Sequence, residues 1–121
     1  MSDSPKSIQV AVTIWPKLMI LAERRSTITY QELGAPLGIT GRALQSFDRF
    51  LNPIRHYCLQ HDLPPLSALV VRKDSGLPGS GVDADEMDID RVYAYNWRGR
   101  SPLIPSAAEL AAAMERGKNH E

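Results

Sequence analysis

The sequence contains one cysteine, no long apolar run and no excess of charge of either sign. The single thiol, Cys58, has no partner for an internal disulfide, which suits a reducing cytoplasm. We find neither a signal-peptide pattern nor an apolar stretch long enough to cross a membrane, so we expect a cytoplasmic protein without a membrane partner. Basic and acidic residues both number 14, which argues against a strongly basic nucleic-acid-binding protein but allows a local basic patch.

A recognisable set of catalytic or metal-binding residues is also lacking. His56, Cys58 and His61 lie close in sequence, but on a helix His56 would point away from the other two, and no fourth ligand is near. The glycines of residues 76–81 lack the lysine and the following helix of a P-loop. The acidic residues of segment 83–90 fit no EF-hand spacing. We therefore expect no cofactor and no metal, and we interpret Cys58 as a small buried hydrophobe.

The chain length of 121 residues suits one domain with its own core. We expect a flexible tail over residues 1–6, a single domain over residues 7–117 and a second flexible tail over residues 118–121. Residues 1–61 hold 7 basic and 4 acidic residues, whereas residues 62–121 hold 7 basic and 10 acidic residues. The first half therefore carries the basic excess.

Residues 7–25 are apolar at helical spacing and predict a helix. Pro16 interrupts this pattern, so we expect either two helical pieces or a helix that begins near Pro16. The apolar stripe, with Trp15 and Met19 as core residues, consists of Ile8, Ala11, Val12, Trp15, Leu18, Met19 and Ala22.

Residues 27–38 indicate a very short strand at 27–29 and then a short helix. Thr29 and Glu32 have the spacing of a capping box, in which each side chain accepts a hydrogen bond from the backbone amide of the other residue. Pro36 removes a backbone donor and predicts that the helix is short or distorted. Gly38 follows at a suitable position for a left-handed cap.

A second helix is predicted to begin at Thr40 or Gly41. Its apolar face is formed by Leu44, Phe47 and Leu51. Its opposite, polar and basic face carries Arg42, Gln45, Ser46 and Arg49. Together the two helices have the outline of a helix-turn-helix motif whose second helix presents cations to solvent.

Several short motifs follow one another over roughly residues 15 to 81. They are Ile28-Thr29-Tyr30-Gln31-Glu32-Leu33, Gly41-Arg42-Ala43-Leu44, Asn52-Pro53, Leu63-Pro64, Leu69-Val70-Val71 and Asp74-Ser75-Gly76-Leu77-Pro78-Gly79. Their order resembles the DNA-binding half of the alkylguanine-DNA alkyltransferases and of their catalytically inactive relatives, the alkyltransferase-like proteins. The resemblance implies a winged helix-turn-helix in which Tyr30 contacts a backbone phosphate. It also implies that Arg42 inserts into the duplex and supports a flipped nucleotide.

The sequence departs from this family at the reactive site. The family motif is Pro-Cys-His-Arg, and the best match here is Pro65-Leu66-Ser67-Ala68. Cys58 lies earlier, in a segment from Ile54 to Asp62 that the family lacks. Because alkyl transfer needs an activated thiolate in a shaped pocket, the sequence predicts a protein that is not an alkyltransferase.

Residues 52–81 predict a further helix, a strand and a loop. Asn52-Pro53 has the order of a helix cap and a first helical residue. The inner face of this helix would carry Ile54, Tyr57, Cys58 and His61. Residues 68–72 are apolar and β-branched enough for a strand, and residues 73–81 are turn-like. A strand and a turn after a helix-turn-helix would form a wing.

Two elements are predicted beyond residue 81. Residues 91–97 alternate Val92, Ala94 and Asn96 with Tyr93, Tyr95 and Trp97, which predicts a strand whose aromatic face packs on the helices or stacks on bases. Ser106 and Glu109 form a second capping box, and the helix that follows is expected to end at Gly117. An apolar face that would dock on the domain or on a second copy consists of Ala107, Leu110, Ala111 and Met114.

The predicted fold class is α+β, namely a single winged helix-turn-helix-like domain with an added strand and a C-terminal helix. The predicted function is a non-catalytic module that binds double-stranded DNA through Tyr30, Arg42, Gln45, Arg49, Arg72 and Lys73. The alternative is an interaction or inhibitor protein, such as a bacterial or phage defence accessory, that keeps the fold and binds a protein partner or forms a homodimer. An enzyme that pairs Ser67 or Cys58 with a histidine ranks third, because no recognised motif surrounds either residue.

Overall fold

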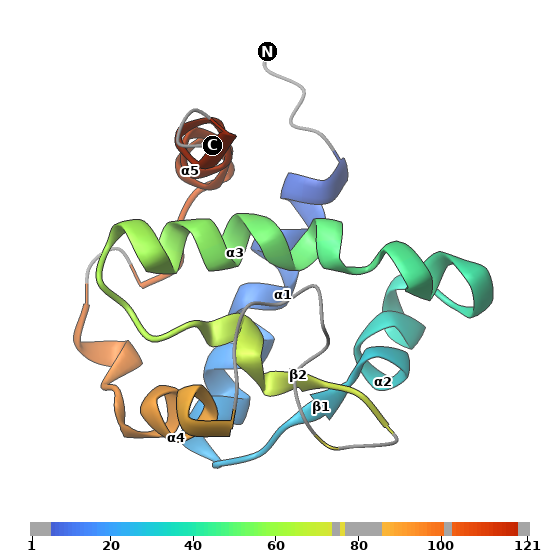
Figure 1. The fold of residues 1–121 in the computed structure, drawn as a ribbon, viewed down its shortest axis with the longest axis horizontal. Coiled ribbons are helices and arrows are strands. Elements are labelled where there is room, and N and C mark those ends of the chain that lie inside the picture. The colour runs from blue at the N-terminus through green and yellow to red at the C-terminus, as the bar shows by residue number, and fades with distance from the viewer. Residues whose placement is uncertain (1–5, 74–75, 77–85, 101–102, 119–121) are drawn as a thin grey trace.

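The computed structural model describes residues 6–73, 76, 86–100 and 103–118 of the 121-residue chain. These residues are mostly helical and include a small two-stranded parallel sheet, which fits the α+β class in its broad sense (Figure 1). The elements, with 3₁₀ helices labelled η, are α1 (Lys6–Glu23), β1 (Ile28–Thr29), α2 (Tyr30–Gly34), η1 (Ala35–Leu37), η2 (Gly41–Ser46), α3 (Asp48–Gln60), η3 (Leu66–Leu69), β2 (Val70–Val71), α4 (Glu86–Ala94), η4 (Trp97–Gly99) and α5 (Ala107–Lys118).

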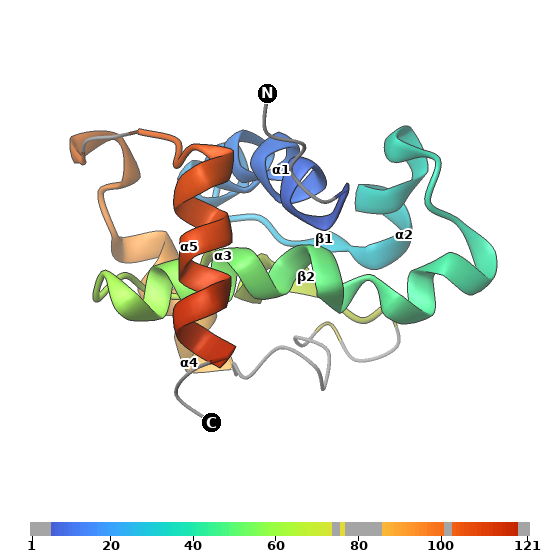
Figure 2. The ribbon, with the colours of Figure 1, turned by 90° about the horizontal axis from the view of Figure 1, so that it is seen from above.

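Helix α3 occupies the centre of the molecule. Helices α1 and α5 and the 3₁₀ helix η3 all pack against it, and Figure 2 shows α5 crossing over it. Helix α2 and η2 gather at the N-terminal end of α3, whereas α4 lies nearer its C-terminal end (Figure 1). This arrangement places the helix-turn-helix candidate at one end of the molecule.

Helix α1 runs without interruption through Pro16, so the prediction of two pieces or of a start near Pro16 is wrong. A proline inside a helix costs about 3 kcal/mol, whereas a fully buried apolar side chain contributes roughly 1.5–3 kcal/mol. The buried side chains on both sides of Pro16 therefore outweigh the lost hydrogen bond. They are Ile8, Ala11, Ile14, Trp15, Leu18, Met19 and Ala22.

The capping box predicted at Thr29 is present. The Glu32 amide donates to the Thr29 hydroxyl oxygen at 3.1 Å, and the Thr29 amide donates to the Glu32 carboxylate at 3.1 Å. Helix α2 is short, as Pro36 predicts, and the chain continues as the 3₁₀ helix η1. Gly38 ends this segment in the left-handed conformation with a φ of 75°, which is the predicted cap.

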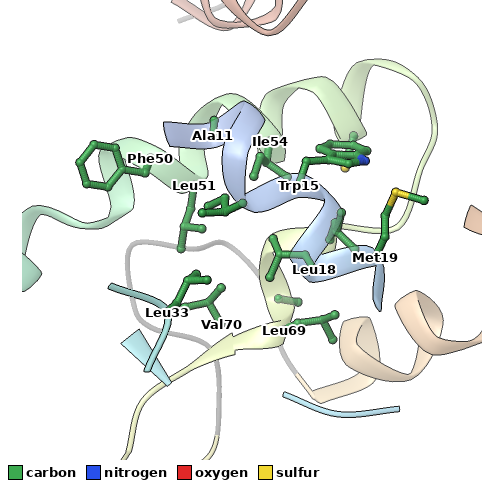
Figure 3. Close-up of a cluster of buried hydrophobic side chains, with 14 of the residues drawn as sticks. Ala11, Trp15, Leu18, Met19, Leu33, Phe50, Leu51, Ile54, Leu69 and Val70 are labelled. Atoms are coloured by element: carbon green, nitrogen blue, oxygen red, sulfur yellow. The ribbon is translucent and has the colours of Figure 1, made fainter. Parts of the chain in front are cut away.

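The second helix of the motif differs from the prediction in its form and agrees with it in its phase. Residues 41–46 form the 3₁₀ helix η2, and α3 begins after a turn at Phe47. Phe47 and Leu51 are fully buried and Leu44 is half-buried, as the pattern predicts. Figure 3 shows Leu51 pointing toward Leu33 and Val70. The predicted outer face is exposed, and it comprises Arg42, Gln45, Ser46 and Arg49.

The prediction that a new helix begins at Asn52-Pro53 is wrong, because Pro53 lies inside α3. The missing amide of Pro53 leaves the Arg49 carbonyl without its helical donor. The α3 stripe from Phe50 to Cys58 is nonetheless almost completely inaccessible on both sides of Pro53, and this burial keeps the helix continuous.

The strand predicted over residues 68–72 is shorter than expected. Only Val70 and Val71 pair with β1, in parallel, with Ile28 opposite Val70 and Thr29 opposite Val71. Residues 66–69 form η3 instead. The wing predicted over residues 73–81 falls mostly on residues outside the described part of the chain.

The added strand predicted over residues 91–97 is wrong. Residues 86–94 form helix α4, and Trp97 begins the 3₁₀ helix η4. Ile89 and Val92 are buried at helical spacing, and the indole N–H of Trp97 donates to the Val92 carbonyl at 2.9 Å. Trp97 folds back onto the end of the helix, where its ring packs against Tyr95 at a centroid distance of 4.7 Å.

The second capping box is present, since the Ser106 amide donates to the Glu109 carboxylate at 3.1 Å and the Glu109 amide donates to the Ser106 hydroxyl at 3.2 Å. Helix α5 includes Gly117 and does not stop there, because it ends at Lys118. Leu110 is fully buried, which shows that the helix docks on the domain. Gln60 of α3 secures it by donating to the Ala113 carbonyl at 2.8 Å.

We expect Leu51→Ala to lower the free energy of unfolding by about 2–5 kcal/mol, because Leu51 is fully buried and its truncation leaves a cavity. Urea unfolding followed by circular dichroism measures this change. Leu59→Ala is the matched control on α3, since Leu59 is 68% exposed and its loss should change stability by less than about 0.5 kcal/mol. Equal losses for both variants would contradict the assigned phase of α3.

We also expect the stabilising effect of Glu32 to depend on pH. Hydrogen bonds from Thr29 lower the pKa of Glu32 below its usual value, so its contribution is present at neutral pH and is lost as the pH falls through the folded-state pKa. Glu32→Gln should therefore lower the melting temperature at neutral pH, and the two melting curves should converge once the pH falls below the folded-state pKa of Glu32. A difference that stayed constant with pH would contradict this assignment.

Candidate nucleic-acid interface

An open hollow of about 370 Å³ lies between α2, η2 and the end of β2. Of the described residues, six line it, and four of these belong to the predicted DNA-binding set. The lining residues are Tyr30, Gln31, Leu44, Gln45, Arg72 and Lys73. The structure therefore brings the two cations that follow β2 next to the outer side of the helix-turn-helix candidate.

The pairing of β1 with β2 explains why these residues meet. Thr29 lies opposite Val71 in the parallel pair, so the next residues along the two strands, Tyr30 and Arg72, leave the sheet at the same edge. Gln31 and Lys73 follow them into the lining of the hollow. Neither Gln31 nor Leu44 was included in the predicted set, and Leu44 was assigned to the apolar inner face of its helix.

Arg42 and Arg49 are exposed but are not among the residues that line the hollow. Arg42 precedes Gln45 by three residues in η2, and side chains at this spacing lie above one another in a 3₁₀ helix. Arg42 is thus on the side of η2 that faces the hollow. Arg49 projects from the first turn of α3, where its guanidinium lies 4.7 Å from the centre of the Phe50 ring.

Tyr30 is anchored from two sides. Its ring packs edge-on against Phe47 at a centroid distance of 5.8 Å, and its hydroxyl donates to the Asp48 carboxylate at 3.3 Å. Asp48 was not predicted as a site residue. Its negative charge beside Tyr30 opposes the approach of a phosphate to that hydroxyl.

Two carboxylates offset part of the positive charge of this face. Glu32 accepts hydrogen bonds from the amide and hydroxyl of Thr29, which lower its pKa, and the charge of Lys73 lowers it further. Glu32 is therefore anionic at neutral pH. Among the described residues, the cations Arg42, Arg49, Arg72 and Lys73 outnumber the carboxylates Glu32 and Asp48.

The two candidate nucleophiles, Cys58 and Ser67, are buried in the core of the domain. Cys58 is 1% exposed, and burial raises the pKa of its thiol to about 12, against smaller lowering effects of the Leu66 backbone and Arg100. The interpretation of Cys58 as a buried hydrophobe is confirmed. Ser67 is fully buried too, and its hydroxyl makes no hydrogen bond. Neither atom can reach a substrate without opening of the core.

The histidines next to Cys58 have structural contacts. His61 stacks on Tyr57 at a centroid distance of 4.0 Å, and its Nδ1 lies 2.9 Å from the Tyr57 carbonyl oxygen. His56 Nε2 lies 3.5 Å from the Arg55 guanidinium. Within the described ranges, no group of three or more His, Cys, Asp or Glu residues is placed to hold a metal ion.

None of the helices in the described segments combines the length and the apolar character needed to span a membrane. No protein-family model matches the chain, and the curated proteins and the solved structures give no match either.

Because Cys58 is inaccessible and its thiol is protonated at neutral pH, we expect no alkyl transfer from O6-alkylguanine DNA to the native protein. Intact-protein mass spectrometry after incubation with such DNA should show an unchanged mass. A small disulfide reagent should likewise react with Cys58 only after the protein is unfolded in urea. An alkylated Cys58 in the native protein would overturn both the burial argument and the expectation of a non-catalytic protein.

Proposed function

We propose that the protein is a non-catalytic module of the alkyltransferase-like type that binds double-stranded DNA through the face around the α2–η2–β2 hollow. The observation that carries this proposal is the convergence of Arg72 and Lys73 with Tyr30 and Gln45 around one open hollow of about 370 Å³. The resemblance of the Tyr30 and Arg42 motifs to those of alkyltransferases supports it independently.

The side chains of this face suit a phosphate backbone. Arg72 and Lys73 provide donors on one side of the hollow, and Arg42 extends the cationic surface along η2. Gln31 and Gln45 carry amides that can both donate and accept, which is the chemistry that reads base edges. Because Glu32 and Asp48 weaken the local field, binding through this face is expected to be modest and sensitive to salt.

The competing proposal is that the same face binds a protein. The carboxylate of Asp48 next to Tyr30 favours it, because a surface that combines both signs of charge matches a mixed protein surface better than a polyanion. The two proposals differ in their salt dependence and in the sign of the effect of removing Asp48.

We expect fluorescence anisotropy with a labelled duplex at low salt to detect binding that weakens steeply as salt is added. Arg72→Gln and Lys73→Gln should each lower the slope of log affinity against log salt by about 0.9, because each removes one phosphate contact. Arg42→Ala should weaken binding by roughly 1–3 kcal/mol if it reaches a base edge. The matched control is Arg116→Gln on α5, an exposed arginine away from the hollow.

Asp48→Asn should strengthen duplex binding several-fold, because it removes a negative charge near the proposed phosphate path and keeps an acceptor for the Tyr30 hydroxyl. The same titration measures it. No binding by the unsubstituted protein at low salt, or weaker binding by Asp48→Asn, would favour the protein-binding proposal.

A further inference from the structure

A second hollow, of about 180 Å³, lies between the C-terminal half of α3 and helix α4. It is lined by Arg55, Leu59, Leu63, Pro65, Asp88 and Arg91. Pockets for cofactors and small-molecule substrates usually measure about 300–1,000 Å³, so this one suits a single side chain. Among the described residues, it shares no lining residue with the α2–η2–β2 hollow, so a ligand can bind there independently of DNA.

The two arginines of this second hollow differ in whether a carboxylate pairs with them. Arg91 donates to the Asp88 carboxylate at 3.0 Å, which neutralises that carboxylate and fixes the direction of the Arg91 guanidinium. The Arg91 side chain remains 64% exposed, so the N–H groups of its guanidinium that do not contact Asp88 are accessible. The Arg55 guanidinium lies 3.5 Å from Nε2 of its neighbour His56 and forms no ion pair with any carboxylate in the described part of the chain. Among the described lining residues, Arg55 is therefore the one cation without a carboxylate partner.

Each helix places an exposed apolar side chain one turn away from its arginine. Leu59 follows Arg55 by four residues on α3 and is 68% exposed. Met87 precedes Arg91 by four residues on α4 and is 72% exposed. Residues four apart lie on the same side of a helix, so both helices present an arginine together with a large apolar side chain. Arginine and methionine are enriched in protein interfaces relative to the rest of the surface.

We propose that the α3–α4 hollow is a docking site for a segment of a second protein that places an aspartate or glutamate carboxylate between Arg55 and Arg91. The carboxylate accepts hydrogen bonds from the two guanidinium groups, and an apolar residue next to it in the partner packs against Leu59. A planar guanidinium matches a carboxylate with paired hydrogen bonds, which gives the contact its direction.

The surrounding charges select a single carboxylate over a nucleic acid. The exposed carboxylates Asp62 and Asp90 lie close in sequence to Leu59 and Arg91. Their negative charges disfavour the approach of a polyanion to this part of the surface. A peptide segment with one acidic residue avoids this cost because the rest of the segment is uncharged.

The test uses the full-length, ¹⁵N-labelled protein and two blocked dipeptides as probes, N-acetyl-Leu-Glu-amide and N-acetyl-Leu-Gln-amide. Titration with the Glu peptide should shift the backbone resonances of Arg55, Leu59 and Arg91 in a saturable manner. The Gln peptide has the same shape without the charge and should bind roughly tenfold more weakly, as expected for loss of a charge-assisted hydrogen bond.

Arg55→Gln and Arg91→Gln should each abolish the preference for the Glu peptide while leaving the other resonances of the spectrum in place. The preserved spectrum shows that the variants are folded. Arg116→Gln, an exposed arginine on α5, is the matched control and should bind the Glu peptide unchanged.

Equal binding of the two peptides, or shifts centred elsewhere, overturns the proposal. Inorganic phosphate that shifts the same resonances as strongly as the Glu peptide shows a general anion site and overturns the protein partner. Resonances that move on dilution of the protein alone show self-association and assign the hollow to a second copy of the chain.

Discussion

The buried stripe of α3 is the constraint on which the rest of the structure depends. Its inward side chains from Phe50 to Cys58 are almost inaccessible, and α1, α5 and η3 all pack on them. Because the stripe continues through Pro53, the helix has to begin before Asn52. This start puts Asp48 and Arg49 in the first turn, beside Tyr30 and the candidate interface. The position of these charges therefore follows from core packing.

The aromatic side chains extend this constraint across the domain. Trp15 packs edge-on against Tyr57 of α3 at a centroid distance of 5.6 Å and against Trp97 at 6.1 Å. Arg100 donates to the Tyr57 hydroxyl at 2.8 Å, which satisfies the polar end of a side chain that is otherwise buried. Together with the bidentate pair of Arg98 and Glu23, these contacts fasten the segment after α4 onto α1 and α3.

Elements whose signals are local could be predicted from the sequence. The capping boxes at Thr29 and Ser106 need only residues three positions apart, and both are present. The left-handed Gly38 and the outward phase of Arg42 and Arg49 depend equally on near neighbours. The predictions were wrong where contacts between residues far apart in sequence determine the local structure. A proline such as Pro16 or Pro53 would break an isolated helix. In this domain α1 and α3 stay continuous because other elements bury their apolar side chains.

The strand predicted over residues 91–97 and the hollow missed by the sequence analysis also depend on contacts that the local sequence does not show. Residues 91–97 are too few to separate a strand period from a helix period, and the deciding contact is the fold of Trp97 back onto Val92. The outer surface of the helix-turn-helix candidate was predictable, but its hollow was not. That hollow exists because two-residue strands pair Thr29 with Val71, and strands this short carry no register signal of their own.

The packing of α5 against both α1 and α3 also affects when the domain can fold. Leu110 and Ala113 complete a core whose other side is formed by Ile8 and Ala11, near the opposite end of the described chain. Contacts between segments so far apart in sequence close large loops, which slows folding. Helices α1 and α3 can pack on each other before α5 is available, but the parts of both helices that α5 covers stay exposed until α5 has formed. Those parts are open to chaperones and to aggregation in the meantime.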